Sequence, residues 1–146
     1  MQLRYVYTPD VVRCTGDTDA LTAAGMMRHR HVGALVIVDS ENAPIGVVTD
    51  RDLVVQVLAE GLDPRKTAIG PLARKPVVIA EEEEELKTAV ERMRTHGIRR
   101  LPIVNRSGAL VGITTLDDVL GYIVEEANAL VQMTTKEQNV ERHLHR

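Results

Sequence analysis

The chain has 146 residues, of which 44% are apolar and 27% charged, and its net charge is −3. This globular balance excludes a disordered tail or a collagen-like repeat, and no apolar run approaches the roughly 18 residues that a membrane span needs. A weakly acidic chain has no general attraction to nucleic acid, and aromatic residues for base stacking make up only 2%. We therefore expect no nucleic acid and no membrane among its partners.

The cellular compartment is indicated by the N-terminal sequence and by the number of cysteines. The N-terminus has no charged segment followed by a long apolar one, so we predict no signal peptide. The single cysteine, Cys14, excludes an internal disulfide and a cysteine-built zinc site. Together these features predict a cytoplasmic protein.

The sequence repeats itself with an offset of 66 residues. Val32–Asp39 aligns without a gap with Ile98–Asn105, and Gly46–Asp52 aligns with Gly112–Asp118. Chance matches would not stay in one register over so many apolar and glycine positions. The chain is therefore predicted to contain two copies of one unit.

Both copies predict the same order of elements. A short β-prone stretch is followed by an amphipathic helix, an apolar strand, a polar turn, a second strand and a final helix. The stretch is Asp10–Cys14 or Pro76–Ala80, the first strand Leu35–Val38 or Leu101–Val104, and the second strand Ile45–Val48 or Leu110–Thr114. The final helix begins at Thr49 or Thr115. The order is β-α-β-β-α, twice, which predicts an α+β fold.

The predicted boundaries are 1–64 for the first unit and 65–127 for the second, with 128–146 as a polar C-terminal tail that extends the last helix and frays. A unit of this size buries too little to be stable alone, so we expect the two sheets to pack together. The final helices carry apolar residues on more than one side, which predicts packing on a second chain. These residues are Leu53, Val54, Val55, Val57 and Leu58, and Val119, Leu120, Ile123 and Val124.

Each copy places a threonine after an apolar strand and an aspartate three residues later, as Thr49 and Asp52 or as Thr115 and Asp118. One interpretation is a helix cap, in which the two side chains bond free backbone N–H groups. The other is a ligand site, because a helix N-terminus can hold a phosphate and a carboxylate can hold a ribose diol. Duplication of the pattern after a glycine favours the ligand site, and the cap remains open.

These motifs resemble the cystathionine-β-synthase (CBS) domain, and the chain resembles a stand-alone CBS-domain pair from Leu3 to about Glu126. The resemblance rests on the aligned strand segments and on Gly-Val-Val-Thr-Asp-Arg-Asp with Gly-Ile-Thr-Thr-Leu-Asp-Asp. It implies two units about a pseudo-twofold axis. It also implies association into a homodimer and two clefts for adenosine-containing ligands such as AMP, ATP, NAD or S-adenosylmethionine.

The resemblance also implies site residues. Asp52 and Asp118 would bond ribose hydroxyls, while Thr49 and Thr115 would face ribose or phosphate. The adenine would lie against the backbone of the first strands, and the residues that open the second strands would face phosphate. The first set is Val12, Arg13, Cys14, Val78, Ile79 and Ala80, and the second is Gly33, Ala34, Arg99 and Arg100.

The two arginines are expected to differ in their direction. Because successive strand residues point to opposite faces, at most one of Arg99 and Arg100 should face a given cleft. Arg100 is favoured, since the family pattern has a basic residue there and a guanidinium grips phosphate with a planar fork. Copy one has Gly33 and Ala34 at these positions, so the two clefts are expected to be electrostatically unequal.

No residue set suggests catalysis: a Ser-His-Asp set, an HExxH zinc motif and a Gly-rich phosphate loop are all missing. Glu81–Glu85 is interpreted as a solvated acidic turn and Cys14 as a buried small residue. We therefore predict no enzyme activity, no metal site and no resident cofactor. Two functions stay open, a regulatory module that senses an adenosyl nucleotide and signals through a dimer or an unidentified protein partner, and a structural dimerisation module without a nucleotide.

Overall fold

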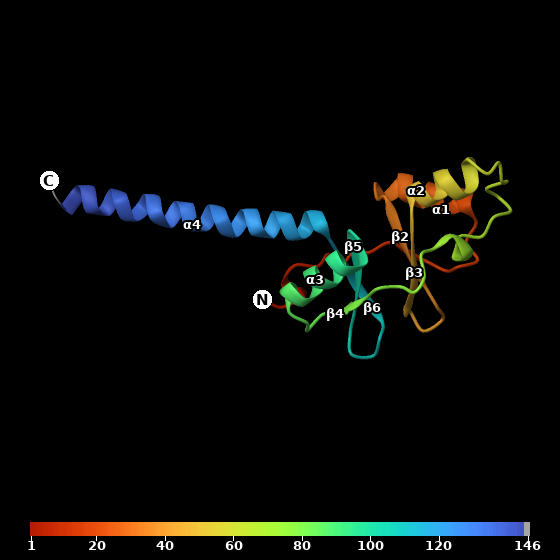
Figure 1. Cartoon of the computed structure of the whole chain (residues 1–146), viewed down its shortest axis with the longest axis horizontal. Helices are drawn as coiled ribbons and strands as arrows, with labels where there is room; N and C mark the ends of the chain where they lie inside the picture. Colours follow the sequence, from red (N-terminus) through yellow and green to blue (C-terminus); the bar gives the residue numbers. More distant parts are fainter. Residues whose placement is uncertain (145–146) are drawn as a thin grey trace.

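The computed structural model describes residues 1–144 and shows two similar α+β units followed by a long helix (Figure 1). The first unit contains β1 (Arg13–Cys14), α1 (Ala20–Arg30), β2 (Ala34–Val38), β3 (Pro44–Thr49), α2 (Asp50–Leu53) and the π-helical turn η2 (Val54–Leu58). The second contains β4 (Ala80–Glu81), α3 (Leu86–His96), β5 (Arg100–Val104), β6 (Leu110–Thr115) and α4 (Leu116–Leu144). Two 3-10 turns, η1 (Leu3–Tyr5) and η3 (Gly70–Leu72), precede the units. The predicted element order is confirmed.

Each unit has a three-stranded sheet in which the middle strand is parallel to the first and antiparallel to the third. In the first sheet Ala34 pairs with Thr49, and in the second Arg100 pairs with Thr115. The threonine that precedes each final helix therefore lies beside the first residue of a middle strand. This register places the predicted site residues of one copy at one end of its sheet.

The units exchange their leading segments. Leu3 is fully buried in the core of the second unit, and its N–H donates to the Glu84 carbonyl at 2.9 Å. Ile69 and Ala73, which follow the first copy in the sequence, are buried in the core of the first unit. In space, each unit therefore includes a short segment from beyond the 1–64 and 65–127 limits of the sequence.

A third apolar cluster joins the two sheets, as expected for units that cannot stand alone. It brings Val36 and Val38 of β2 against Leu110 of β6. Asn42, in the turn after β2, reinforces the contact, because the Leu110 N–H donates to the Asn42 carbonyl at 2.8 Å. The Arg13 guanidinium donates to the Asn42 side-chain oxygen at 2.7 Å. The sheets thus form one interface with both apolar and polar contacts.

The final helices differ from the prediction. The first is short, because α2 passes into the π-helical turn η2, where the Ala59 N–H bonds the Val54 carbonyl. The second is one 29-residue helix, α4, which leaves the body of the molecule (Figure 1). The predicted extension of the last helix beyond residue 127 agrees with α4, which continues to Leu144, and residues 122–144 contain neither glycine nor proline. Residues 145–146 of the predicted tail lie outside the described residues. None of the described helices combines the length and the apolar composition needed to span a membrane.

Candidate functional site

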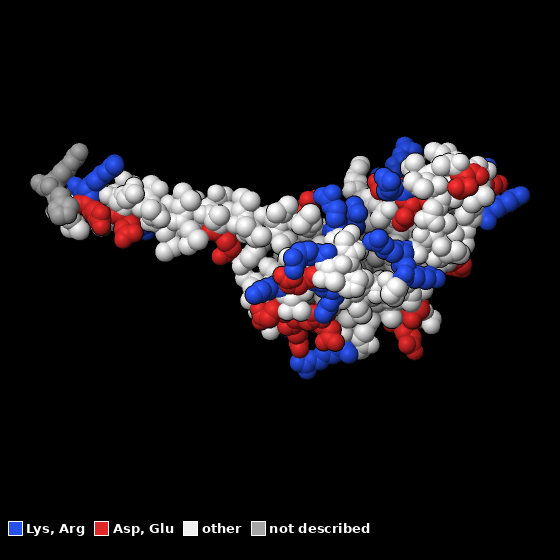
Figure 2. Space-filling model, in the orientation of Figure 1, with Lys and Arg blue, Asp and Glu red and all other residues white. Residues whose placement is uncertain are grey.

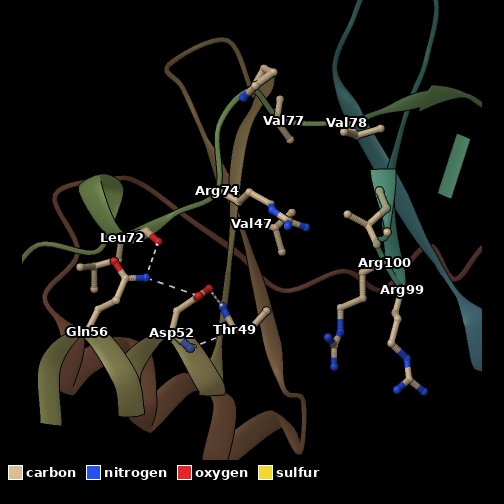
Figure 3. A pocket seen from close by; sticks show the side chains of 13 residues that line it. Val47, Thr49, Asp52, Gln56, Leu72, Arg74, Val77, Val78, Arg99 and Arg100 are labelled. Atoms are coloured by element: carbon tan, nitrogen blue, oxygen red, sulfur yellow. Dashed lines mark hydrogen bonds between the residues drawn. The ribbon is translucent and has the colours of Figure 1, made fainter. Parts of the chain in front are cut away.

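A cleft of about 490 Å³ opens where the two units meet (Figure 3). Thr49, Asp52 and Gln56 line it from the first unit, and Val78, Arg99 and Arg100 line it from the second. The linker between the copies contributes Leu72 and Arg74. The volume falls in the range of small-molecule sites, and elements of both units are needed to form it.

The first-unit wall is the N-terminus of α2, and it carries a complete capping box. The Thr49 hydroxyl accepts from the Asp52 N–H at 3.2 Å, and Asp52 Oδ2 accepts from the Thr49 N–H at 2.8 Å. The cap interpretation is therefore correct as geometry. A carboxylate has about four acceptor positions, so the second oxygen, Oδ1, keeps capacity for a ligand.

Gln56 holds this wall against the linker. Its Nε2 donates to the Leu72 carbonyl at 3.0 Å and makes a longer contact of 3.4 Å with Asp52 Oδ1 (Figure 3). Gln56 is a site residue outside the predicted set, although it lies four residues after Asp52 and thus on the same side of the helix. That spacing is the signal that could have identified it.

Three arginines surround the cleft. Arg74 points into it from the linker, while Arg99 and Arg100 extend side by side from the opposite wall (Figure 3). None of the three takes part in an ion pair with another described residue. Figure 2 shows basic side chains gathered where the two units meet. The cleft therefore has positive charge available for an anion.

The expectation that only one arginine of the pair faces a given cleft is wrong. Arg99 and Arg100 both line this cleft, and both also line a smaller one of about 230 Å³ with Thr115, Leu116 and Asp117. Strand alternation does not apply to Arg99, because β5 begins at Arg100. The pair consequently lies between the N-termini of α2 and α4.

Gly33 lies beside this arginine pair. A Cβ at Gly33 would come within 3.3 Å of Arg100 Nη2 and within 3.2 Å of Asp50 Oδ2. The missing side chain therefore lets the guanidinium lie against the backbone. Ala34, the next residue, pairs with Thr49 in the sheet.

The second Thr-Asp pair repeats the same cap. Asp118 Oδ2 accepts from the Thr115 N–H at 2.8 Å, and the Thr115 hydroxyl accepts from the Asp118 N–H at 3.1 Å. Thr115 lines the smaller cleft, whereas Asp118 is not part of the lining of either of these two clefts. The structure thus brings Asp52, and not Asp118, together with the arginines.

The predicted adenine-facing segments lie mostly elsewhere. Val12 is buried in the first core, and Arg13 is bonded across the interface between the sheets. Burial raises the pKa of the Cys14 thiol to about 11, which agrees with an inert small residue. The second segment is held through its backbone, since the Ile79 carbonyl accepts from Arg92 at 2.7 Å. Ala80 is buried, and Val78 alone of these six residues lines the main cleft.

The acidic run is engaged rather than merely solvated, which corrects the prediction. Glu83 pairs with both Arg4 and Arg106, and Glu84 pairs with Arg92. Glu82 accepts from the Tyr7 hydroxyl at 3.1 Å. The run lines neither cleft, and within residues 1–144 no group of three or more His, Cys, Asp or Glu is arranged to hold a metal ion. It fixes the N-terminal segment to the second unit.

Comparison with known proteins gives the same repeat. The family model for the CBS domain matches residues 3–59 and again residues 69–125. An uncharacterized protein of Methanopyrus kandleri is 40% identical over 111 residues, which cover 76% of this chain and 57% of that protein. The chain thus spans little more than half the length of that relative. Hypoxic response protein 1 of Mycobacterium tuberculosis is 36% identical over 117 residues, covering 80% of this chain and 81% of that protein.

A solved structure has the same fold. The CBS domain protein PAE2072 from Pyrobaculum aerophilum, complexed with AMP, superposes with a TM-score of 0.72 at 25% identity. The match covers 81% of this chain and 89% of that one. Its fold agrees with the two three-stranded units described above, and the two family matches take in most of the chain. This protein therefore belongs to the CBS-domain family and contains a tandem pair of these domains.

Proposed function

We propose that the cleft between the two units binds an adenosine-containing nucleotide and that the chain is a regulatory module without enzyme activity. Binding would be passed on through self-association or through a protein partner. One observation carries the proposal: a carboxylate with spare acceptor capacity, Asp52, faces the same cleft as Arg74, Arg99 and Arg100, which form no ion pair with another described residue.

The carboxylate suits a ribose. Asp52 is held in place by the cap, because its Oδ2 already bonds the Thr49 N–H at 2.8 Å. Its Oδ1 has only the 3.4 Å contact with Gln56 among the described residues, so a diol hydroxyl can donate to it. A side chain fixed before binding loses little conformational entropy when the ligand arrives.

The arginines suit phosphate. Each guanidinium is always charged and presents several donors in a planar fork that matches phosphate oxygens. Three such groups around one cleft favour a nucleotide with more than one phosphate over AMP. The AMP complex of the related Pyrobaculum protein supports the adenosine class as a whole.

The proposal is tested by a thermal-shift panel of AMP, ADP, ATP, NAD and S-adenosylmethionine, followed by calorimetry. A ligand of the native state raises the melting temperature. We expect Asp52→Ala to weaken nucleotide binding in the main cleft by about 1.5–3 kcal/mol, the scale of a charge-assisted hydrogen bond. Asp118→Ala is the matched control, because it removes the same cap from α4 and leaves the main cleft intact. Equal affinity in wild type and Asp52→Ala would contradict the proposal.

The alternative is a structural dimerisation module. It is favoured by the capping boxes, which already use both Thr-Asp pairs, and by the exposed apolar residues Val54, Leu58 and Ile123. A dimer in light scattering, together with no shift for any nucleotide, would select this function.

A further inference from the structure

The helix α4 carries an apolar face that no described residue covers. Only its first turns pack on the body, through Val119, which is 4% exposed. Beyond that turn the large apolar side chains from Leu120 to Val131 are 49–64% exposed, and Figure 1 shows the helix leaving the body. We name the face the α4 stripe, and it consists of Leu120, Ile123, Val124, Ala127, Leu130 and Val131. Steps of three and four residues keep these side chains on one side.

The stripe is symmetric about Ala127. Ile123 and Val131 lie four residues before and after it, and Val124 and Leu130 lie three residues before and after it. Two copies crossing antiparallel at Ala127 would therefore place Ile123 against Val131 and Val124 against Leu130 of the other copy, while Leu120 would face Thr134. The small residue at the centre allows close approach of the two helices. A twofold interface needs such self-complementarity.

The charges beyond the stripe also favour an antiparallel pair. Glu137 and Glu141 continue the stripe toward the C-terminus at helical spacing. In the other direction, the stripe leads through Leu116 to the smaller cleft that Arg99 and Arg100 line. With the crossing at Ala127, Glu137 of one copy lies opposite Asp117 of the other, which lines this cleft together with Arg99 and Arg100. The two guanidinium groups outnumber the one carboxylate there, so the cleft keeps a net positive charge for Glu137. In a parallel pair, Glu137 and Glu141 would instead lie against Glu137 and Glu141 of the other copy. This contact between like charges is unfavourable.

We propose that α4 pairs antiparallel with α4 of a second copy, centred on Ala127, and that Glu137 and Glu141 of each copy reach the Arg99–Arg100 cleft of the other. This pairing specifies the self-association included in the proposed function, and it does not require a bound nucleotide.

Cross-linking tests the direction and the register of the helices. Ile123→Cys and Val131→Cys proteins are oxidised separately and as a mixture, and the wild type with Cys14 alone is the control. The antiparallel pair gives a disulfide-linked dimer only in the mixture. A dimer formed by Val131→Cys alone, or none in the mixture, overturns the proposal.

A charge placed at the crossing tests the interface. Ala127→Arg should raise the dissociation constant by about tenfold or more, because it places a charge in an apolar contact. Ala129→Arg is the matched control, since it has the same chemistry but lies on the opposite side of the helix, and it should associate like wild type in light scattering. A monomeric wild type, or equal loss in both variants, overturns the pairing.

Charge reversal tests the contact with the arginines. Glu137→Lys with Glu141→Lys should weaken association, and Arg99→Glu with Arg100→Glu in the same chain should restore it. Lack of rescue contradicts this contact. Thermal shifts with ATP on the Ala127→Arg protein separate the two proposals, because nucleotide binding that persists in the monomer leaves the proposed function standing.

Discussion

Thr114 places a hydroxyl in an otherwise apolar core. Its side chain is fully buried, and its Oγ1 has no hydrogen-bond partner among the described residues. The equivalent position in the first unit, 66 residues earlier, is Val48, which is equally buried and has nearly the same shape. An unsatisfied buried polar group is destabilising by about 1–3 kcal/mol, whereas an apolar group of the same shape carries no such penalty.

We therefore expect Thr114→Val to raise the free energy of unfolding by about 1 kcal/mol in urea denaturation. The reciprocal control is Val48→Thr, which should lower it, because it introduces the same hydroxyl at the equivalent site. A loss of stability in Thr114→Val would mean that the hydroxyl has a partner, such as a buried water.

Single residues also mark the limits of what the sequence could tell about the site. Thr49 and Asp52 were predicted because their pattern recurs in both copies. Arg74 was not, since its counterpart 66 residues earlier is Thr8 and the repeat gives it no signal. Arg99 was assigned the wrong direction, because alternation was applied one residue before the strand begins. Repetition identifies shared positions, and it cannot identify the positions at which the copies differ.

At the scale of elements, the order and type of the strands and helices were predictable, because each copy confirmed the other. The end of α4 was not, since the first copy has no counterpart to residues 128–144. The polarity of that segment suggested fraying, but it contains no helix-breaking residue and its apolar side chains recur at helical spacing. Helix length follows from local propensity as well as from burial.

The acidic turn before α3 is an element held by ion pairs, and its titration is predictable. The hydrogen bond from Arg106 holds the pKa of Glu83 below its ordinary value of 4.5, and the charge of Arg4 adds to the effect. Because the pKa is lower in the folded state, the contribution to stability is present above the unfolded pKa. It is lost as the pH falls below about 4.5 and through the folded pKa.

In an NMR titration, the Glu83 carboxyl should therefore have its midpoint below 4.5. Arg106→Gln should move the midpoint upward, toward the ordinary value, because it removes the main donor. Arg94→Gln serves as control, since Arg94 pairs with Glu91. An unchanged midpoint in Arg106→Gln would show that the ion pair does not act in solution.

At the scale of the whole molecule, both proposals use Arg99 and Arg100. In the proposed helix pair, carboxylates of a second copy approach the same two guanidinium groups that a phosphate would contact in the main cleft. A nucleotide with several phosphates would then compete with the helix of the second copy. By reciprocity, helix pairing would weaken nucleotide binding by the same factor. Through such competition, the concentration of the nucleotide would control how far two chains associate.

The two clefts that the pseudo-twofold relates should not bind equally. The main cleft combines Asp52 with Arg74, Arg99 and Arg100. At the positions 66 residues earlier, the chain has Thr8, Gly33 and Ala34, so the counterpart positions of Arg74, Arg99 and Arg100 carry no charge. Guanidinium groups favour phosphate by a kcal/mol or more each at partly exposed sites, roughly the scale of charged hydrogen bonds.

Calorimetry with ATP is therefore expected to show one tight site per chain and a weaker or empty second one. Arg100→Ala should reduce ATP affinity by about tenfold and AMP affinity less, because fewer phosphate contacts are lost with AMP. Arg106→Ala is the control, since Arg106 lies outside both clefts and pairs with Glu83. Two identical sites per chain, both unaffected by Arg100→Ala, would refute the asymmetry, because the arginines that distinguish the main cleft would then have no effect on the ligand.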